Sequence, residues 1–192
     1  MLAANYNALV ALLGCAMLLL ISACTSHPPL KTADYVSPEQ FAGDWYVVAN
    51  IDYFAERNKV EGKVSYVPTS KPGIYDDIFS ARDGSFDAPR KQLKGWAKSL
   101  NEQNTEYRST FYWIIRSRFS VIHIEPNWML LGHKNRKLAW IMARQPKLSD
   151  ANYAKALQIL SVRGFDTAQV KRVPQFREDI GRDGYHVVKS KK

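Results

Sequence analysis

The fold of this chain is decided by the stretch Phe41-Ala42-Gly43-Asp44-Trp45-Tyr46-Val47-Val48-Ala49-Asn50-Ile51, the first block with the pattern of a folded domain. A glycine before an aromatic pair and an apolar run predicts a turn that leads into a β-strand. Glycine permits a sharp entry, and Trp, Tyr and Val favour the half-buried surface of a strand. Alternation places Trp45, Val47, Ala49 and Ile51 on one face and Tyr46, Val48 and Asn50 on the other. Both faces are largely apolar, so each should be covered.

Further strand-like runs follow this stretch, separated by turn residues. The eight expected strands span residues 44–52, 59–67, 73–81, 91–99, 107–114, 118–125, 128–133 and 138–144. Short strands at regular spacing favour an antiparallel barrel or a sandwich, and a barrel of about eight strands encloses room for one small ligand.

The spacing of apolar residues changes after the last of these strands. Ser149-Asp150 offers a helix N-cap, and Arg163-Gly164 offers a basic last turn and a C-cap. Between them, apolar residues recur at helical spacing at Tyr153, Ala156, Leu157 and Leu160. The pattern predicts one amphipathic helix against the barrel wall, followed by a short strand near residues 170–173.

Three motifs carry a resemblance to a known family. They are Gly43-x-Trp45-Tyr46, the last strand Leu138-Ala139-Trp140-Ile141-Met142-Ala143-Arg144, and Gly164-Phe165-Asp166 after the helix. From about residue 41 to residue 173 the chain resembles the lipocalins, and in particular the lipoprotein lipocalins of bacteria. The resemblance implies an all-β fold: an eight-stranded antiparallel up-and-down barrel with one C-terminal flanking α-helix.

The resemblance also implies a structural role for residues at the closed end of the barrel. In this family an Arg of the last strand packs across the Trp of the first strand, roles that fall here to Arg144 and Trp45, beside Gly43. A cation–π contact of this kind is worth about 0.5–2 kcal/mol.

The N-terminal residues have the pattern of an export signal. Residues 1–23 carry no charged side chain and include an apolar run at 8–21, the length of a signal-peptide core. The run ends in Ile21-Ser22-Ala23-Cys24, which resembles the lipobox of bacterial lipoproteins and implies lipidation of Cys24. We therefore expect a signal peptide at 1–23, a lipidated tether at 24–36, the barrel and helix at 37–176, and a basic, mobile tail at 177–192. Thr25 after the Cys implies, by the same resemblance, a lipid anchor in the bacterial outer membrane that faces the periplasm.

Charge narrows the classes of partner. Lys and Arg number 27 against 18 Asp and Glu, a net charge of +9, which suits an anionic membrane surface or an acidic lipid, or simply a soluble basic surface. The basic residues are scattered and match no recognition motif, so nucleic acid is not an expected partner. No dinucleotide-binding or Walker motif occurs, no cofactor is indicated, and the sequence leaves the oligomeric state open.

Catalytic groups are sparse. The four histidines are His27, His123, His133 and His186, and none shows a metal-binding spacing. Asp76 and Asp77 are adjacent in an expected strand, so they should point to opposite faces and cannot pair. We therefore expect neither an enzyme nor a metal site.

A binding cavity is better supported. Strand alternation and the resemblance give candidate lining residues, namely Val47, Ala49, Val64, Tyr66, Gly95, Ala97, Tyr107, Phe111, Val121 and His123. Gly95 and Ala97 are small and should leave space, although the same side chains could fill the barrel as a core. His123 could hold a polar headgroup, but a core or outward position is favoured for it.

Two arginines are candidates for contacts with a ligand headgroup. Arg116 and Arg118 are expected in a turn after the apolar run Trp113-Ile114-Ile115. If that turn lies near the open end, the arginines could meet a phosphate or carboxylate and the apolar residues could touch membrane.

These expectations combine into one function and one alternative. The resemblance implies a lipid-anchored protein that binds or carries a hydrophobic ligand, such as a fatty acid or lysophospholipid, at the outer membrane. The alternative is an envelope interaction lipoprotein with a filled barrel and no small-molecule ligand.

Overall fold

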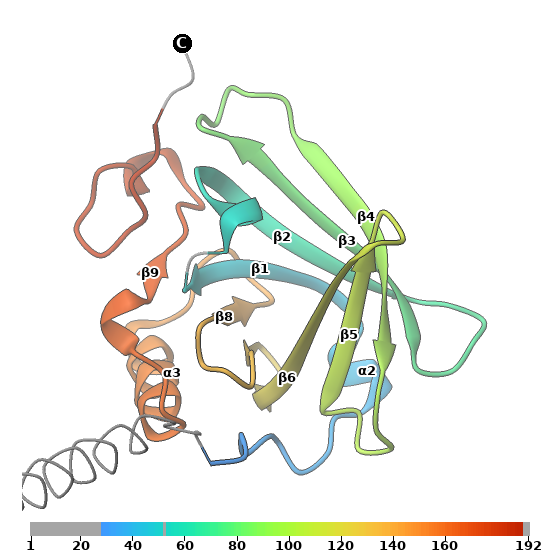
Figure 1. Cartoon of the computed structure of the whole chain (residues 1–192). Helices are drawn as coiled ribbons and strands as arrows, with labels where there is room; N and C mark the ends of the chain where they lie inside the picture. The colour runs from blue at the N-terminus through green and yellow to red at the C-terminus, as the bar shows by residue number, and fades with distance from the viewer. Residues whose placement is uncertain (1–27, 52, 190–192) are drawn as a thin grey trace, which may run out of the picture.

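The computed structural model describes residues 28–51 and 53–189, and shows a β-barrel with a helix packed on its outside (Figure 1). The barrel strands are β1 (Gly43–Asn50), β2 (Lys59–Pro68), β3 (Ile74–Asp83), β4 (Lys91–Ser99), β5 (Glu106–Phe111), β6 (Ile115–Glu125), β7 (Trp128–Gly132) and β8 (Ala139–Ala143). Each strand pairs antiparallel with the next, and β1 closes the barrel by pairing with both β8 and β2. The predicted eight-stranded up-and-down barrel is confirmed.

The connection between β5 and β6 lies earlier in the chain than predicted. Phe111 pairs directly with Ile115, and the turn is formed by Tyr112, Trp113 and Ile114. Tyr112 and Trp113 adopt left-handed φ angles of 48° and 65°. Such angles are usually signalled by Gly, Asn or Asp, so two aromatic residues concealed the turn from sequence analysis.

Two β-bulges change which side chains face the interior. In β1, Val47 pairs with Met142 and Ala49 with Ile141, so Val48 is an extra residue in the ladder. Trp45 and Val47 therefore pack in the barrel interior, whereas Ala49 packs on the outside. The expectation that Ala49 and Ile51 share the face of Trp45 is wrong, because a bulge reverses the alternation beyond it.

One side of the barrel is covered by α3 (Asp150–Val162), the predicted helix (Figure 1). Ser149 caps its first turn, accepting a hydrogen bond of 3.2 Å from the Asn152 amide. The buried helix residues Ala156 and Leu160 belong to an apolar cluster that includes residues of β1, β7 and β8. This second core explains why β1 is apolar on both faces.

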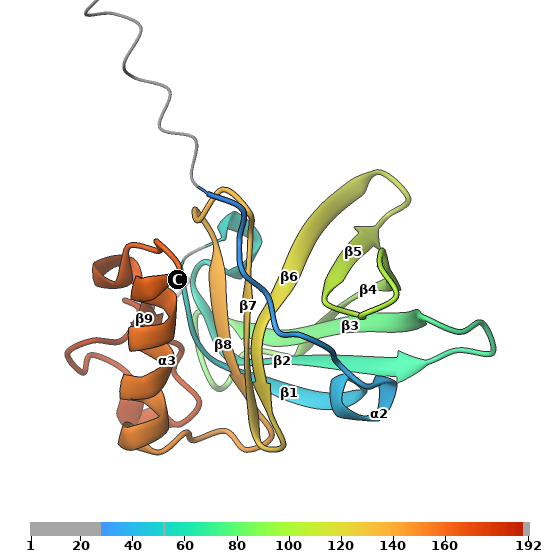
Figure 2. The same cartoon turned by 90° about the horizontal axis from the view of Figure 1, so that it is seen from below.

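The N-terminal segment lies along the barrel wall (Figure 2). The Ala33 amide donates to the Val121 carbonyl and the Val36 amide to the Gln103 carbonyl, both at 2.9 Å. Residues 28–36, expected as part of a free tether, are therefore docked on the barrel. The signal peptide expected at 1–23 and the lipidation site Cys24 lie outside the described residues.

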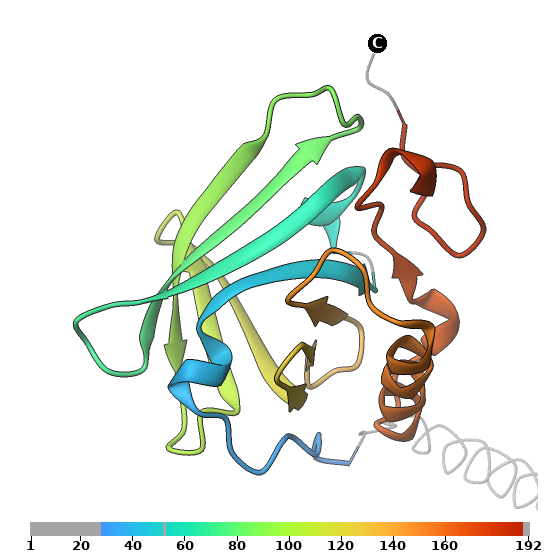
Figure 3. The same ribbon diagram turned by 180° about the vertical axis from the view of Figure 1, so that it is seen from behind.

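The C-terminal segment folds back on β1 and β2 (Figure 3). It contains η3 (Thr167–Gln169), β9 (Lys171–Arg172), which pairs with β1, and η4 (Arg177–Asp179). Gln175 donates to the carbonyls of Val47 at 2.8 Å and Gly62 at 3.2 Å, and the Lys189 amide donates to Asn58 at 2.6 Å. The residues expected as a mobile tail thus make specific contacts as far as Lys189.

The residues named for both apolar cores lie within the described range 28–189. Across that described part, no helix combines the length and the apolar character needed to cross a bilayer.

Candidate functional site: a ligand cavity in the barrel

The two ends of the barrel differ. In an up-and-down barrel, alternate connections lie at opposite ends. We call the end with the β1–β2, β3–β4, β5–β6 and β7–β8 connections the mouth end, and the other end the base.

Trp45 and Arg144 lie at the base, in the arrangement that the family resemblance implies. The Arg144 guanidinium carbon lies 3.5 Å from the centroid of the buried Trp45 ring. Its Nη1 and Nη2 donate to the carbonyl oxygens of Asp44 at 3.0 Å and Gln40 at 2.8 Å. Gly43 has a φ of 94°, and a Cβ there would lie 3.1 Å from Arg144 Nη1, so glycine suits both the turn and the close approach.

An aromatic stack fills the interior next to the base. The short helix α2 (Pro38–Phe41) inserts Phe41, whose ring stacks on Tyr66 at 4.3 Å and on Tyr107 at 4.1 Å between centroids. Tyr75 meets Phe41 edge-on at 5.1 Å, and Phe119 stacks on Tyr107 at 5.6 Å. These rings form a solid floor.

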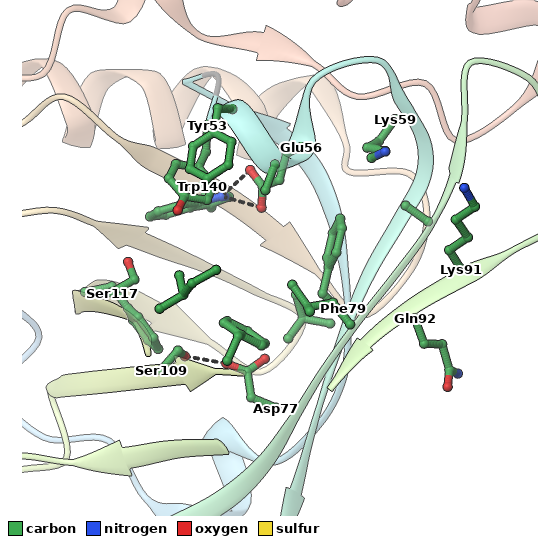
Figure 4. Close-up of a pocket in the computed structure, with 18 of the residues that line it drawn as sticks. Tyr53, Glu56, Lys59, Asp77, Phe79, Lys91, Gln92, Ser109, Ser117 and Trp140 are labelled. Atoms are coloured by element: carbon green, nitrogen blue, oxygen red, sulfur yellow. Dashed lines mark hydrogen bonds between the residues drawn. The ribbon is translucent and has the colours of Figure 1, made fainter. Parts of the chain in front are cut away.

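A cavity of about 440 Å³ lies between this floor and the mouth, and Figure 4 shows the side chains around it. Its wall includes Val64, Tyr66, Phe79, Leu93, Phe111, Phe119, Leu131 and Met142, and its mouth side includes Tyr53, Phe54, Lys59, Lys91, Tyr112 and Ile115. A mostly apolar cavity of this size with a few polar groups is typical of a small-molecule site.

One buried polar group of the cavity wall is the carboxyl of Asp77. Asp77 is 3% exposed and accepts a hydrogen bond from the Ser109 hydroxyl (Figure 4). Its neighbour in register on β2 is Tyr66, a member of the aromatic floor. Burial raises the pKa of Asp77 to about 6, and the hydrogen bond from Ser109 opposes this rise. At neutral pH a carboxylate therefore stands in an apolar cavity with one hydrogen-bond donor from the described residues.

A second polar group lies nearer the mouth. Trp140 Nε1 donates to both carboxylate oxygens of Glu56, at 3.0 and 2.8 Å (Figure 4). Asn50 Nδ2 also donates to Glu56, at 2.8 Å. Glu56 belongs to η2 (Phe54–Glu56) in the β1–β2 connection, so these bonds tie this connection to the barrel wall at the cavity.

Seven of the ten candidate lining residues fall into two groups. Val64, Tyr66 and Phe111 line the cavity. Four others, Val47, Ala97, Tyr107 and Val121, are buried in the interior cluster and are absent from the cavity wall. Part of the predicted set therefore builds the packed interior.

Gly95 does not open space in the way that its size suggested. A Cβ built on Gly95 would lie 2.2 Å from the Thr110 carbonyl oxygen and 2.6 Å from the Phe111 ring. The neighbouring strand already occupies that volume, so glycine is required there for close packing.

His123 lies outside the barrel, in the outward position that the sequence favoured, and its candidacy as a cavity-lining residue is wrong. In β6, Val121 pairs with Leu131 and His123 with Leu130, so a bulge at Ile122 turns His123 outward. Its Nε2 lies 3.0 Å from Glu125, whose carboxylate also accepts from Lys155 of α3 at 2.6 Å. These two hydrogen bonds, that of Lys155 foremost, lower the pKa of Glu125 to about 2.

Arg116 and Arg118 also point away from the cavity. They lie in β6 rather than in a turn, and Ser117 between them lines the cavity. Side chains alternate along a strand, so both arginines project outward, where they are exposed. The basic residues that line the cavity are Lys59, paired with Asp83 at 3.3 Å, and Lys91.

Sequence reasoning missed Glu56, Trp140 and Asp77 as cavity residues. Strand alternation from Phe79 could have placed Asp77 inside, but Glu56 lies in a connection with no periodic pattern. Within 28–51 and 53–189, no group of three or more His, Cys, Asp and Glu side chains is arranged to hold a metal ion.

Together, the up-and-down barrel, the closed base and the apolar cavity below an open mouth define a lipocalin fold. The model of the Lipocalin-like domain family matches residues 36–175, and the chain belongs to this family.

Individual relatives agree with the family match. The chain is 22% identical over 163 residues to the outer membrane lipoprotein Blc of Vibrio cholerae, covering 81% of this chain and 93% of that protein. The resemblance to bacterial lipoprotein lipocalins is thereby confirmed. Among solved structures, insecticyanin of the tobacco hornworm Manduca sexta superposes with a TM-score of 0.64 at 15% identity, covering 79% of this chain and 87% of that one. Lobster apocrustacyanin A1 superposes with a TM-score of 0.58 at 13% identity, covering 74% of this chain and 81% of that one.

Proposed function

We propose that the protein binds a lipid with a single acyl chain, a fatty acid or a lysophospholipid, and carries it at the bacterial outer membrane. Lipocalins are generally binding and transport proteins for hydrophobic ligands rather than enzymes. The observation that carries the proposal is the apolar cavity of about 440 Å³ above the aromatic floor. Transfer of an acyl chain into it yields roughly 25 cal/mol for each Å² of apolar surface removed from water.

The polar groups of the cavity support one orientation of the ligand. Asp77 at the floor is acidic, whereas Lys59 and Lys91 line the mouth side. An anionic head at the floor would meet a buried carboxylate of like charge, which is unfavourable in a low-dielectric cavity. The acyl tail therefore enters first, and the phosphate or carboxylate head stays at the mouth.

The alternative of a filled barrel is less well supported. The aromatic stack fills only the part next to the base, and the remaining interior is the cavity.

Location at the outer membrane rests on the lipobox at Cys24 and on similarity to an outer membrane lipoprotein. In this proposal the acyl groups on Cys24 anchor the barrel, and the cavity serves the membrane that holds the anchor. Several acyl chains give durable anchoring where one does not.

A pair of variants on one strand tests the binding site. Leu93 lines the cavity from β4, whereas the next residue, Lys94, is exposed on the outer face. Leu93→Trp should reduce the affinity for a fluorescent fatty acid by about tenfold or more, because the indole takes up ligand volume. Lys94→Trp should bind like the parent. Equal affinity of the Leu93→Trp protein would contradict the assignment of the cavity.

A further inference from the structure

The mouth end of the barrel carries an exposed apolar tip. Tyr112, Trp113 and Ile114 of the β5–β6 turn, here called the tip, are 67%, 78% and 80% exposed. The tip has a defined conformation, because β5 and β6 stay paired up to Phe111 and Ile115 at its foot. Trp96 of β4 supports it, its ring meeting that of Trp113 edge-on at 4.9 Å.

A row of three cations crosses the outer face of the same strands. Lys98 of β4 pairs in register with Arg108 of β5, which pairs in register with Arg118 of β6. We call these three residues the cation row. Among residues 28–51 and 53–189, none of the three forms an ion pair with an acidic side chain. Like charges directly opposite each other destabilise a sheet, so the row suits an external anion.

The tip and the cation row are spaced as an interfacial membrane site requires. Arg118 follows Ile115 by three residues on β6, which is about 10 Å along a strand. Apolar groups of interfacial proteins enter the boundary of headgroups and acyl chains by about 5–10 Å. With the tip at that depth, Arg118 lies at the level of the phosphates, and its register neighbour Arg108 lies beside it on β5.

The N-terminal segment reaches the same end of the molecule. Arg136 of the β7–β8 connection donates to the carbonyl oxygen of Pro28 at 2.6 Å. Figure 2 shows the start of this segment beside that connection, on the side of the β5–β6 turn and opposite α2. Cys24 precedes Pro28 by four residues, a chain length of at most about 14 Å.

We propose that the mouth end is a docking face for an anionic lipid bilayer, with the tip inserted between headgroups and the cation row on their phosphates. The inference deepens the proposed function, on which its purpose rests: the mouth opens onto the bilayer, and the acyl ligand passes between the two without crossing water. Tyr112 of the tip and the adjacent Ile115 also line the cavity, so the tip lies beside the cavity.

The test measures co-sedimentation of the chain from Thr25, which lacks the acyl anchor, with two kinds of vesicle. One contains phosphatidylglycerol and phosphatidylcholine in equal parts, and the other contains phosphatidylcholine alone. We expect the parent to bind the anionic vesicles and to bind them less at high salt. Failure of the parent to bind anionic vesicles would overturn the proposal.

Variants with matched controls assign the binding to the tip and the cation row. Trp113→Asp with Ile114→Asp should lower vesicle affinity by about tenfold or more, because both apolar side chains leave the interface. Val162→Asp, at a residue of α3 that is 72% exposed, is the control and should bind like the parent. Arg108→Gln with Arg118→Gln should remove the preference for anionic vesicles. Lys71→Gln with Lys147→Gln, at exposed positions near the base, should keep it.

A second readout separates this proposal from the proposed function. Uptake of a soluble fluorescent fatty acid should be unchanged in the tip variant, since Trp113 and Ile114 are absent from the cavity wall. If the parent protein takes up ligand but does not bind vesicles, the docking face is refuted and the carrier function is not. A parent that binds vesicles but takes up no ligand contradicts the carrier function alone. Parent-like vesicle binding by both double variants would also overturn the docking face.

Discussion

The carboxyl group of Asp77 on β3 accepts a hydrogen bond from the Ser109 hydroxyl on β5, across the strand that lies between them. The contact is possible because β4 presents only Gly95 and Ala97 in register with these residues. The carboxylate of Asp77 is thus stabilised by a hydrogen bond from one hydroxyl, in a cavity whose wall is otherwise mostly apolar.

This pair predicts that ligand binding depends on pH. A ligand that displaces water from around Asp77 favours its neutral form, so binding is linked to proton uptake. The pKa of Asp77 is about 6 in the free protein. Affinity for a lysophosphatidylcholine, whose own charge does not change in this range, should therefore rise as pH falls from 7 to 5, by less than about tenfold per pH unit. Isothermal titration calorimetry at several pH values measures this affinity.

Asp77→Asn is the matched variant for this prediction, because the amide has the shape of the carboxyl group and does not change its charge with pH. Its affinity should exceed that of the parent at pH 7 and should stay constant down to pH 5. A parent affinity independent of pH, or the same pH dependence in Asp77→Asn, would refute the role of this carboxyl in binding.

The same group predicts a pH dependence of folding stability. Its folded pKa of about 6 lies above the ordinary value of 3.8, so the folded state binds the proton more tightly than the unfolded state. The stabilisation is fully present below pH 3.8 and is lost as pH rises through about 6, a change of up to about 3 kcal/mol. The free energy of unfolding of the parent relative to Asp77→Asn should therefore fall between pH 4 and pH 7 in urea titrations. A constant difference between the two proteins would argue against a raised pKa.

Trp45 and Arg144 should dominate the stability of the base. Trp45→Ala should lower the free energy of unfolding by about 3–5 kcal/mol, since a fully buried aromatic side chain is removed. Arg144→Ala should cost about 1–3 kcal/mol, through the lost ring contact and the hydrogen bonds to two carbonyl groups. Arg116→Ala, at an exposed position, should stay within about 0.5 kcal/mol. Equal effects of Arg144→Ala and Arg116→Ala in denaturant titrations would be incompatible with the stack.

The anchor prediction concerns Cys24. Cys24→Ala should move the protein from the membrane fraction to the soluble fraction, because the side chain that takes the lipid is absent. Cys15→Ala is the control and should leave the distribution unchanged. Fractionation with mass spectrometry of the purified chain gives the answer: an unlipidated parent would refute the lipobox assignment.

Much of the fold was predictable because its signals are local. The strand periods, the turn at Gly43 and the helical spacing of Ala156 and Leu160 depend on neighbours in sequence, and the structure contains the corresponding elements. The stack of Arg144 on Trp45 joins distant residues and was available only through the family resemblance.

The cavity was harder to predict, because its wall depends on register. A bulge leaves no mark in composition, yet those at Val48 and Ile122 turned Ala49 and His123 out of the barrel. Because the turn lies at Tyr112, β6 begins earlier than predicted. Arg118 therefore lies on the outer face of β6 and not in a turn at the mouth. The hydrogen bond between Asp77 and Ser109 could not be predicted without knowing the register of β3, β4 and β5.

The measurement that tests the central claim most directly is native mass spectrometry, with lipid extraction, of the chain from Thr25 purified from a bacterial periplasm without detergent. We predict a stoichiometric acyl lipid that is retained by the Lys94→Trp protein and lost from the Leu93→Trp protein. An empty parent that also fails to take up added fatty acids and lysophospholipids would contradict a carrier function and favour the filled-barrel alternative.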